Sequence, residues 1–481
     1  MRLHPFLLAA SAALVVGCTD AVAPPVMPPP QVERVVMDTL VSGAVVLDLA
    51  VQGAAEIRIR YWTEQGHALD LRTAAPAPGQ QVFLPELEAG RDYQYALTAI
   101  NAAGVAAPEV HGGFRAPAVP ADLATVRFTT TGGSSEPLTM LQSFLDFKGF
   151  VIVNRRGEPV WWWRTNGSPQ GFARRANGNF VLNDAYRGLY EVTPARQVVS
   201  SLTGTRNGDS HHDVLVTPHN TILYLGLETR RIADSVLTGD IIREWNPETG
   251  HVSTVWSVFD ALDPATDVGP KSNSKDWTHA NAIAYGDHGN IILSLNWLSQ
   301  VVSIAPDFRS VEWRLGGPGS TFTLDPDAVF QGQHTAELLP GGRILLFDNG
   351  RDRVAPHDYS RALELALEPA SGRLEPGTKG TARVAWSYRA TPEGFSPYMS
   401  SARRLANGNT FVFFSLPPGV YGGRGTHGGL EVRPDGSVAF QLGIVNSGTP
   451  RAIYRGEPLS SILAPGQSAL VSRELRASAQ P

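Results

Sequence analysis

The sequence has little of three features that would point to a particular class of protein: cysteine, excess positive charge and long apolar segments. Cys18 is the only cysteine in 481 residues, which excludes an intramolecular disulfide framework and a metal site built on several cysteines. Lysine and arginine (40) are outnumbered by aspartate and glutamate (45), so the charge does not favour nucleic-acid binding. Beyond the N-terminus, no apolar run approaches the ~18 residues that a membrane span needs.

Glycine and proline are abundant and spread along the whole chain. There are 48 glycines and 36 prolines, whereas charged residues make up only 18%. Glycine and proline punctuate strands with tight turns, so this composition favours many short strands. The sequence therefore predicts an all-β protein.

The N-terminus has the pattern of an export signal. Arg2 is followed by an apolar stretch over residues 6–16 and then by Gly17-Cys18. The segment Leu14-Val15-Val16-Gly17-Cys18 resembles the lipobox of bacterial lipoproteins, which implies that residues 1–17 are a signal peptide and that Cys18 carries a lipid. We expect an exported cell-envelope lipoprotein that is attached to the membrane by this lipid. Thr19 in place of aspartate implies, by resemblance to the lipoprotein sorting rule, the outer membrane, on its periplasmic or surface face.

Two segments are expected between the lipid and the main domain. Residues 18–31 contain five prolines and predict an extended tether. Residues 32–116 alternate apolar and polar side chains, as in Ile57, Ile59 and Tyr61, and predict a small β-sandwich. The stretch Leu87-Glu88-Ala89-Gly90-Arg91-Asp92-Tyr93 resembles the fibronectin type III signature, with Tyr93 at the tyrosine corner. An unrelated sandwich is the alternative, and its protein partner is unknown.

An internal repeat dominates residues 121–481. One hairpin type has a glycine- or asparagine-rich turn, as in Ala176-Asn177-Gly178-Asn179 and Ala406-Asn407-Gly408-Asn409, and it alternates with a second type that closes on a bulky residue such as Trp161 or Trp256. Two hairpins make a four-stranded unit, and six units of about 60 residues predict a six-bladed β-propeller. The sixth first-type hairpin is expected from residues 126–144, completed by the tail at 453–463.

Histidines recur at one place in this repeat. Aligned on their turns, the first-type hairpins place Gln170, His212, His334 and Ser400 six residues before the turn, with His279 at the corresponding place of a longer unit. Equivalent positions on successive blades surround the propeller axis, so the three imidazoles are expected at one mouth of the channel. They could form a metal site with an open position, or a site where one imidazole attacks and the others bind developing charge. The spacing leaves both chemistries open, and capping of strands is the non-functional alternative.

Several short motifs together resemble the bacterial arylsulfate sulfotransferase family. They are, in chain order, His211-His212-Asp213-Val214, Asp276-Trp277-Thr278-His279-Ala280-Asn281, Gln333-His334-Thr335-Ala336, Phe347-Asp348-Asn349-Gly350, Tyr359-Ser360-Arg361 and Phe395-Ser396-Pro397. The resemblance implies a six-bladed propeller that moves a sulfuryl group from an aryl sulfate donor to a phenolic acceptor. It also implies that no metal or other cofactor is needed, and no Gly-Lys-Ser/Thr loop for a nucleotide phosphate is present.

The same resemblance assigns roles to individual residues. His334 matches the histidine that becomes N-sulfated, which gives ping-pong kinetics, and His279 matches a general acid and base. His212 and Asn281 would donate hydrogen bonds to the sulfate oxygens. His211 is the alternative to His212, because strand alternation lets only one of them face the channel.

The chain departs from the family at one position. Asn296 stands where the family has an arginine, and it brings no charge to a sulfate oxygen. Arg351 or Arg353 could supply that charge from another blade. Trp277 and Trp297 could stack on aryl rings, or could instead pack between blades.

Two other functions are consistent with the same features. One is a metal-dependent propeller hydrolase with His212, His279 and His334 as ligands. The other is a non-catalytic propeller that binds partners at the cell surface, which the sandwich, the tether and the missing arginine favour.

Overall fold

The computed structural model describes residues 27–204, 210–269, 275–351, 353, 358–372, 377–446 and 451–472. These residues form strands, and their only helices are two single 3-10 turns, η1 (Val258–Asp260) and η2 (Pro326–Ala328). The prediction of an all-β chain is therefore confirmed. No helix in the described ranges is long and apolar enough to cross a membrane. The expected signal peptide, Cys18 and the tether up to residue 26 lie outside the described residues.

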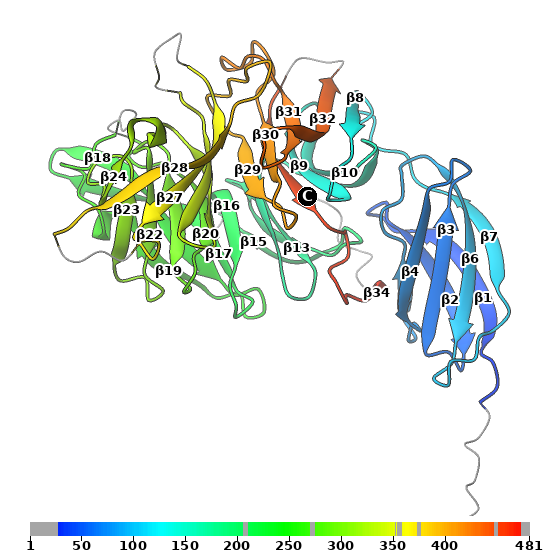
Figure 1. The fold of residues 1–481 in the computed structure, drawn as a ribbon. Coiled ribbons are helices and arrows are strands. Elements are labelled where there is room, and N and C mark those ends of the chain that lie inside the picture. Colours follow the sequence, from blue (N-terminus) through cyan, green and yellow to red (C-terminus); the bar gives the residue numbers. More distant parts are fainter. Residues whose placement is uncertain are drawn as a thin grey trace, which may run out of the picture.

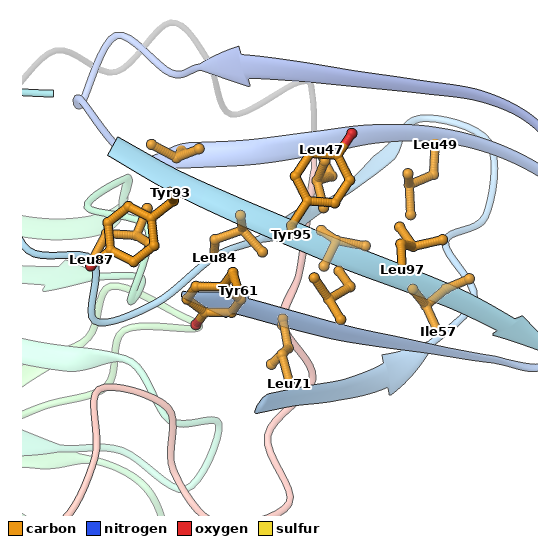
Figure 2. Close-up of a cluster of buried hydrophobic side chains, with 14 of the residues drawn as sticks. Leu47, Leu49, Ile57, Tyr61, Leu71, Leu84, Leu87, Tyr93, Tyr95 and Leu97 are labelled. Carbon is orange, nitrogen blue, oxygen red and sulfur yellow. The ribbon is translucent and has the colours of Figure 1, made fainter. Parts of the chain in front are cut away.

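The N-terminal part consists of two four-stranded sheets that share one core. The first has the order β1 (Gln31–Thr39), β2 (Val45–Gln52), β5 (Gln80–Phe83), β34 (Leu470–Ser472), and the second β4 (Ala68–Ala74), β3 (Glu56–Trp62), β6 (Asp92–Ile100), β7 (Val110–Arg115). Along β3, Ile57 and Tyr61 are buried whereas Arg58 and Arg60 are exposed, which is the alternation expected of a strand with one face on a core. Figure 2 shows side chains of both sheets filling this core.

The Tyr93 hydroxyl lies in that core and accepts a hydrogen bond from the Glu88 amide at 2.9 Å. A tyrosine bonded to the backbone a few residues upstream is the feature of a tyrosine corner. The assignment to the fibronectin type III group stays a prediction.

Six further sheets of four or five strands follow in the chain. In sheet order they are β33 (Ile453–Leu459), β9 (Leu138–Phe144), β10 (Lys148–Asn154), β11 (Pro159–Arg164); β12 (Ser168–Arg174), β13 (Phe180–Ala185), β14 (Gly188–Val192), β15 (Val198–Thr203); β16 (His211–Val216), β17 (Ile222–Ile232), β18 (Ser235–Trp245), β19 (Val252–Ser257); β20 (Ala280–Tyr285), β21 (Ile291–Leu295), β22 (Gln300–Ile304), β23 (Val311–Leu315); β25 (His334–Leu339), β26 (Arg343–Asp348), β27 (Arg361–Glu368), β28 (Gly380–Tyr388), β24 (Phe322–Leu324); and β29 (Ser401–Arg404), β30 (Thr410–Phe414), β31 (Gly428–Val432), β32 (Val438–Asn446), β8 (Val126–Gly132).

The first strand of each sheet in this order is called its innermost strand. Each innermost strand contacts the innermost strands of both neighbouring sheets, and β29 of the last sheet contacts β33 of the first. The six sheets therefore form a closed ring. Figure 1 shows the six sheets beside the two N-terminal sheets, whose strands β1 to β7 are coloured blue to cyan.

Both ends of the ring segment take part in closing it. β33, from near the C-terminus, pairs with β9 and completes the first sheet, whereas β8 pairs with β32 at the outer edge of the last sheet. The segment 126–144, which the sequence analysis assigned to one hairpin, is thus divided between two sheets. Backbone groups at both edges of the closure are paired in this way, which resists opening of the ring.

The expected domain 121–481 needs one correction, because its last described strand belongs to the N-terminal sheets. β34 pairs with β5, and Leu470 lies opposite Val82. The physical reason is that β5 would otherwise present an open sheet edge, whose backbone groups β34 satisfies. A shared apolar cluster, with Val46 and Phe83 on one side and Trp161 and Trp163 on the other, joins the two parts. These tryptophans serve packing.

Candidate active site

A cavity of about 300 Å³ opens at one end of the ring. Its lining residues lie at or just before the start of innermost strands, or in the loops at the same end of their neighbours. They are Gln170, His212, His279, Asn296, Trp297, His334, Tyr398, Met399, Tyr421 and Tyr454. The three histidines predicted to converge at one mouth of the channel therefore line one cavity.

A local irregularity in the innermost strands aims these side chains. The pairing register shifts in β16, β20 and β25 next to the histidines, and His212 and His279 have left-handed φ values of 55° and 51°. In β25 the left-handed residue is Thr335, at 53°, rather than His334. The three histidines are thus not at strictly equivalent positions, as the turn alignment assumed. Such bulges bend a strand and redirect its side chains, and they are common beside active sites.

His334 is buried and is held by neutral partners. Its Nδ1 lies 2.8 Å from Asn349 Oδ1, and the Asn349 amide group donates to the carbonyls of Ser396 and Met399 at 2.6 and 3.0 Å. Because Asn349 uses its NH₂ group on carbonyls, its oxygen must accept, so His334 carries its proton on Nδ1. Nε2 accepts a long hydrogen bond of 3.2 Å from the Met399 amide.

The electrostatics keep His334 uncharged. Burial is the largest effect and lowers its pKa well below the ordinary 6.5, and the positive charges of Arg455 and Arg351 lower the pKa further, against the opposing effect of the Asn349 hydrogen bond. At neutral pH this residue is therefore an imidazole with a lone pair on Nε2.

His279 has an ionic partner instead. Its Nδ1 lies 2.6 Å from Asp276 Oδ2, which also accepts a hydrogen bond from Trp297 Nε1 at 2.8 Å. Burial opposes the charge on Asp276, but the hydrogen bonds from His279 and Trp297 outweigh it and lower the pKa of the carboxyl. A carboxylate on Nδ1 fixes the ring and stabilises an imidazolium, which suits proton transfer at Nε2. The Trp297 ring stacks on the imidazole at 4.4 Å.

His211 and His212 are both buried, but only His212 lines the cavity. Their Nδ1 atoms are 2.9 Å apart, and His211 Nε2 lies 3.2 Å from the Gly226 carbonyl. A carbonyl only accepts, so His211 donates from Nε2 and accepts at Nδ1 from His212. Neutral His212 then presents a bare Nε2 to the cavity. Burial, followed by the charges of the other histidines, lowers the pKa of His212 well below 6.5, so the expected donation to a sulfate oxygen requires it to take up a proton.

The two predicted asparagines have structural hydrogen bonds. Asn281 is fully buried behind the cavity wall, where its amide donates to Gln333 O at 2.7 Å. The structure does not bring it to the cavity surface. Asn296 lines the cavity, but its amide donates to Gly332 O and Gln333 O, both at 2.8 Å. Both residues therefore support the strand that carries His334.

Of the two candidate arginines, only Arg351 lies beside the site. Its Nη1 donates to Asn296 Oδ1 at 3.0 Å, and its guanidinium lies over the Trp297 ring at 4.5 Å. Arg353 pairs with the Asp348 carboxylate and donates to Tyr359 O and Val329 O. Asn296 thus holds an arginine from the next sheet.

The two tryptophans also differ. Trp277 is buried in the core between sheets, where its ring packs on Phe259 and its Nε1 donates to Asp267 O at 2.7 Å. It does not line the cavity, and the packing interpretation holds for it. Trp297 lines the cavity.

Several residues of the site were not predicted from the sequence. Asp276 and Asn349 stood in the quoted motifs without a role, although the spacing Asp276-x-x-His279 was a usable signal for the first. Tyr454 lines the cavity, and its neighbour Arg455 is fully buried with Nη1 3.1 Å from Asp213 Oδ2. No local pattern marks these two, because β33 reaches the site only by closing the ring.

No group of three or more histidine, cysteine, aspartate or glutamate side chains is placed to hold a metal ion within the described ranges. The three cavity histidines are instead bonded to protein groups through Nδ1.

Comparison with known proteins gives one family match. The model of the arylsulfotransferase (ASST) family matches residues 124–452. No curated protein matches the chain.

The solved structures that match this chain are distant. A protein of unknown function from Bacteroides caccae is 14% identical with a TM-score of 0.42, over 67% of this chain and 99% of that one. Virginiamycin B lyase from Staphylococcus aureus is 9% identical with a TM-score of 0.35, over 81% and 100%. BamB from Moraxella catarrhalis is 10% identical with a TM-score of 0.27, over 77% and 93%.

Proposed function

This chain belongs to the arylsulfotransferase family, and we propose that it moves a sulfuryl group from an aryl sulfate to a phenolic acceptor in two steps, through a sulfated His334. The family supports sulfotransferase activity on small aryl donors and acceptors. The two-step mechanism is our inference from the cavity.

One observation carries the assignment of roles: the two central imidazoles have opposite kinds of partner. His334 is bonded to a neutral amide, and burial lowers its pKa, so it is a free base. His279 Nδ1 is bonded to a carboxylate, which orients the ring and supports positive charge on it during proton transfer. A nucleophile and a proton donor require such different partners.

In the first step, Nε2 of His334 attacks the sulfur atom. The N–S bond forms, the S–O bond to the aryl group breaks, and the leaving phenolate takes the proton of His279. The His334 ring becomes positively charged while it keeps the proton on Nδ1. The hydrogen bond to Asn349 Oδ1 strengthens as this charge develops, and the long hydrogen bond from the Met399 amide must yield to the substrate.

In the second step, a phenol replaces the first product. His279 removes its proton, the phenol oxygen attacks the sulfur, and the N–S bond breaks to restore neutral His334. The donor and acceptor rings use the same aromatic residues, Tyr398 and Tyr454, since the Trp297 ring already contacts His279 and Arg351. No nucleotide or metal takes part in this scheme.

The charge on the sulfuryl oxygens needs a cation. We assign this role to Arg351, held against Asn296 and Trp297, in place of the arginine that the family has at position 296. His212 joins it once it has taken up a proton. The charge-assisted contact is about twice as strong as a neutral one, so Arg351 is the main contributor.

The scaffold and location are part of the same proposal. We take the six sheets as the blades of a six-bladed β-propeller and residues 32–116 as a fibronectin type III-like spacer. Export and lipidation of Cys18 would place the enzyme in the cell envelope, on the outer membrane. Loss of radiolabelled fatty acid from the protein in Cys18→Ser tests that location.

The experiment is a sulfuryl-transfer assay with 4-nitrophenyl sulfate as donor and phenol as acceptor. Nitrophenol release that depends on phenol, gives parallel double-reciprocal plots and disappears in His334→Ala supports the proposal. Mass spectrometry of protein quenched without acceptor should find one added sulfuryl group on the peptide that contains His334. A sulfuryl group elsewhere, or intersecting plots, contradicts the two-step scheme.

The same assay decides between the other candidate functions. Activity lost in chelator and restored by a divalent metal would favour a metal-dependent hydrolase. Folded protein that turns over no aryl sulfate, as wild type or as Asn296→Arg, would favour a binding protein.

A further inference from the structure

A second cavity adjoins the candidate active site, and it has a different chemical character. Its volume is about 450 Å³, and Met399 and Tyr421 line both cavities. The rings of Phe144, in the second cavity, and Tyr454, in the first, pack edge to face at 6.4 Å. The two cavities thus share a wall and a rim.

Two cations face the second cavity. Lys148 begins β10 and Arg451 precedes β33, and both line it together with the apolar residues Phe144, Val420 and Ala452. No carboxylate is among its described lining residues. Arg451 has one acidic neighbour among the described ion pairs: its Nε lies 4.0 Å from Asp146 Oδ1. The Arg451 side chain is 47% exposed. The charges of this cavity are therefore available to a ligand.

The first cavity, in contrast, has no lysine or arginine among its described lining residues. Its described lining consists of histidines, neutral amides, aromatic residues and one methionine. It suits a phenol ring and the reacting sulfur, but it gives no second anionic group a place to bind. A phenol with an anionic side chain would fill both cavities, with its ring beside Tyr421, which lines both, and its anion toward Lys148 and Arg451.

We propose that the second cavity selects phenolic substrates that carry an anionic side chain, through Lys148 and Arg451. This inference rests on the proposed function for its reaction, and it deepens that function by naming a substrate class. The apolar residues would hold the linking carbon atoms, and the two cations would pair with a carboxylate or a similar anion.

The test compares two acceptors of the same length, 3-(4-hydroxyphenyl)propanoate and its uncharged amide, with 4-nitrophenyl sulfate as donor. The wild type is expected to prefer the carboxylate about tenfold in kcat/KM. Lys148→Glu and Arg451→Ala should remove that preference by raising the KM for the carboxylate. The kcat/KM for the amide should stay unchanged. Lys379→Glu, at an exposed lysine away from both cavities, is the matched control.

Two further measurements test the charge preference: its dependence on ionic strength, and binding of the two phenols measured without turnover. The preference should shrink as the ionic strength rises from about 0.01 to about 0.5 M, because exposed charges are screened. Calorimetry with the two phenols should show the same tenfold ratio in the wild type and its loss in Lys148→Glu. Equal binding of the two phenols overturns this inference, even if sulfuryl transfer is found. Unequal binding without any transfer overturns only the proposed function.

Discussion

Asn349 is expected to control the reactivity of His334 without touching the substrate. Replacing it with leucine removes the oxygen that accepts the proton of His334 Nδ1 at 2.8 Å. The neutral ring can then move its proton to Nε2, which is the nitrogen that must attack. The ring also loses the Asn349 oxygen that would stabilise the positive charge developing on it during sulfuryl transfer.

The size of the effect follows from these two losses. A neutral hydrogen bond contributes about 0.5–1.5 kcal/mol and one to a charged group about 1.5–3 kcal/mol. The first applies to the resting tautomer and the second to the transition state. The loss at the transition state alone corresponds to about 10- to 100-fold, so Asn349→Leu should lower kcat by at least that factor, with little change in KM for the donor.

A carboxylate at the same position makes a distinct prediction about pH. In the wild type, burial lowers the pKa of His334 well below 6.5, so this residue stays neutral through the neutral range. An opposite charge in contact raises a histidine pKa by about 1–3 units. In Asn349→Asp, His334 is then protonated at higher pH and cannot attack. The acid limb of kcat/KM should move to higher pH, and activity should return on the alkaline side.

The assay is 4-nitrophenyl sulfate turnover with phenol across the pH range, with circular dichroism to verify folding. Asn290→Leu is the control, because it also removes a buried amide, bonded to Ser303 Oγ at 2.6 Å, away from the cavity. If Asn349→Leu stays within about twofold of the wild type, or if Asn349→Asp keeps the wild-type pH profile, the assigned tautomer is wrong.

Three further outcomes follow from other contacts. Arg351→Met should lower kcat/KM for the sulfate donor about tenfold, whereas Arg353→Met, which breaks the pair with Asp348, should lower the melting temperature instead. Burial lowers the pKa of His427 to about 4. The free energy of unfolding should therefore fall by at most about 3 kcal/mol as the pH drops from about 6.5 to about 4. Chemical denaturation at a series of pH values should show a smaller fall in His427→Gln. Truncation after Pro465 removes β34 and should lower the melting temperature, because it exposes the edge of β5. An unchanged thermal unfolding curve would show that the pairing of β34 with β5 does not contribute to stability.

Local patterns determined much of the fold. The alternation of Ile57 and Tyr61 with Arg58 and Arg60 predicted one buried face, and the structure has it, because side chains on a strand point alternately to its two faces. The glycine and asparagine turns predicted the hairpins, because these residues adopt the backbone angles that tight turns require. The same repeat predicted that His212, His279 and His334 would meet, and they line one cavity.

The partners of those histidines were decided only by the tertiary structure. Asn349 directly follows β26, the strand that pairs with β25, and Arg351 reaches Asn296 from another sheet, so neither contact has a local signal. A bulge rather than simple alternation decides that His212 and not His211 faces the cavity. Tyr454 enters the site because β33 closes the ring on a strand more than 300 residues earlier in the chain. Sequence patterns report short-range backbone preferences, whereas charge state and reactivity depend on neighbours that only ring closure brings together.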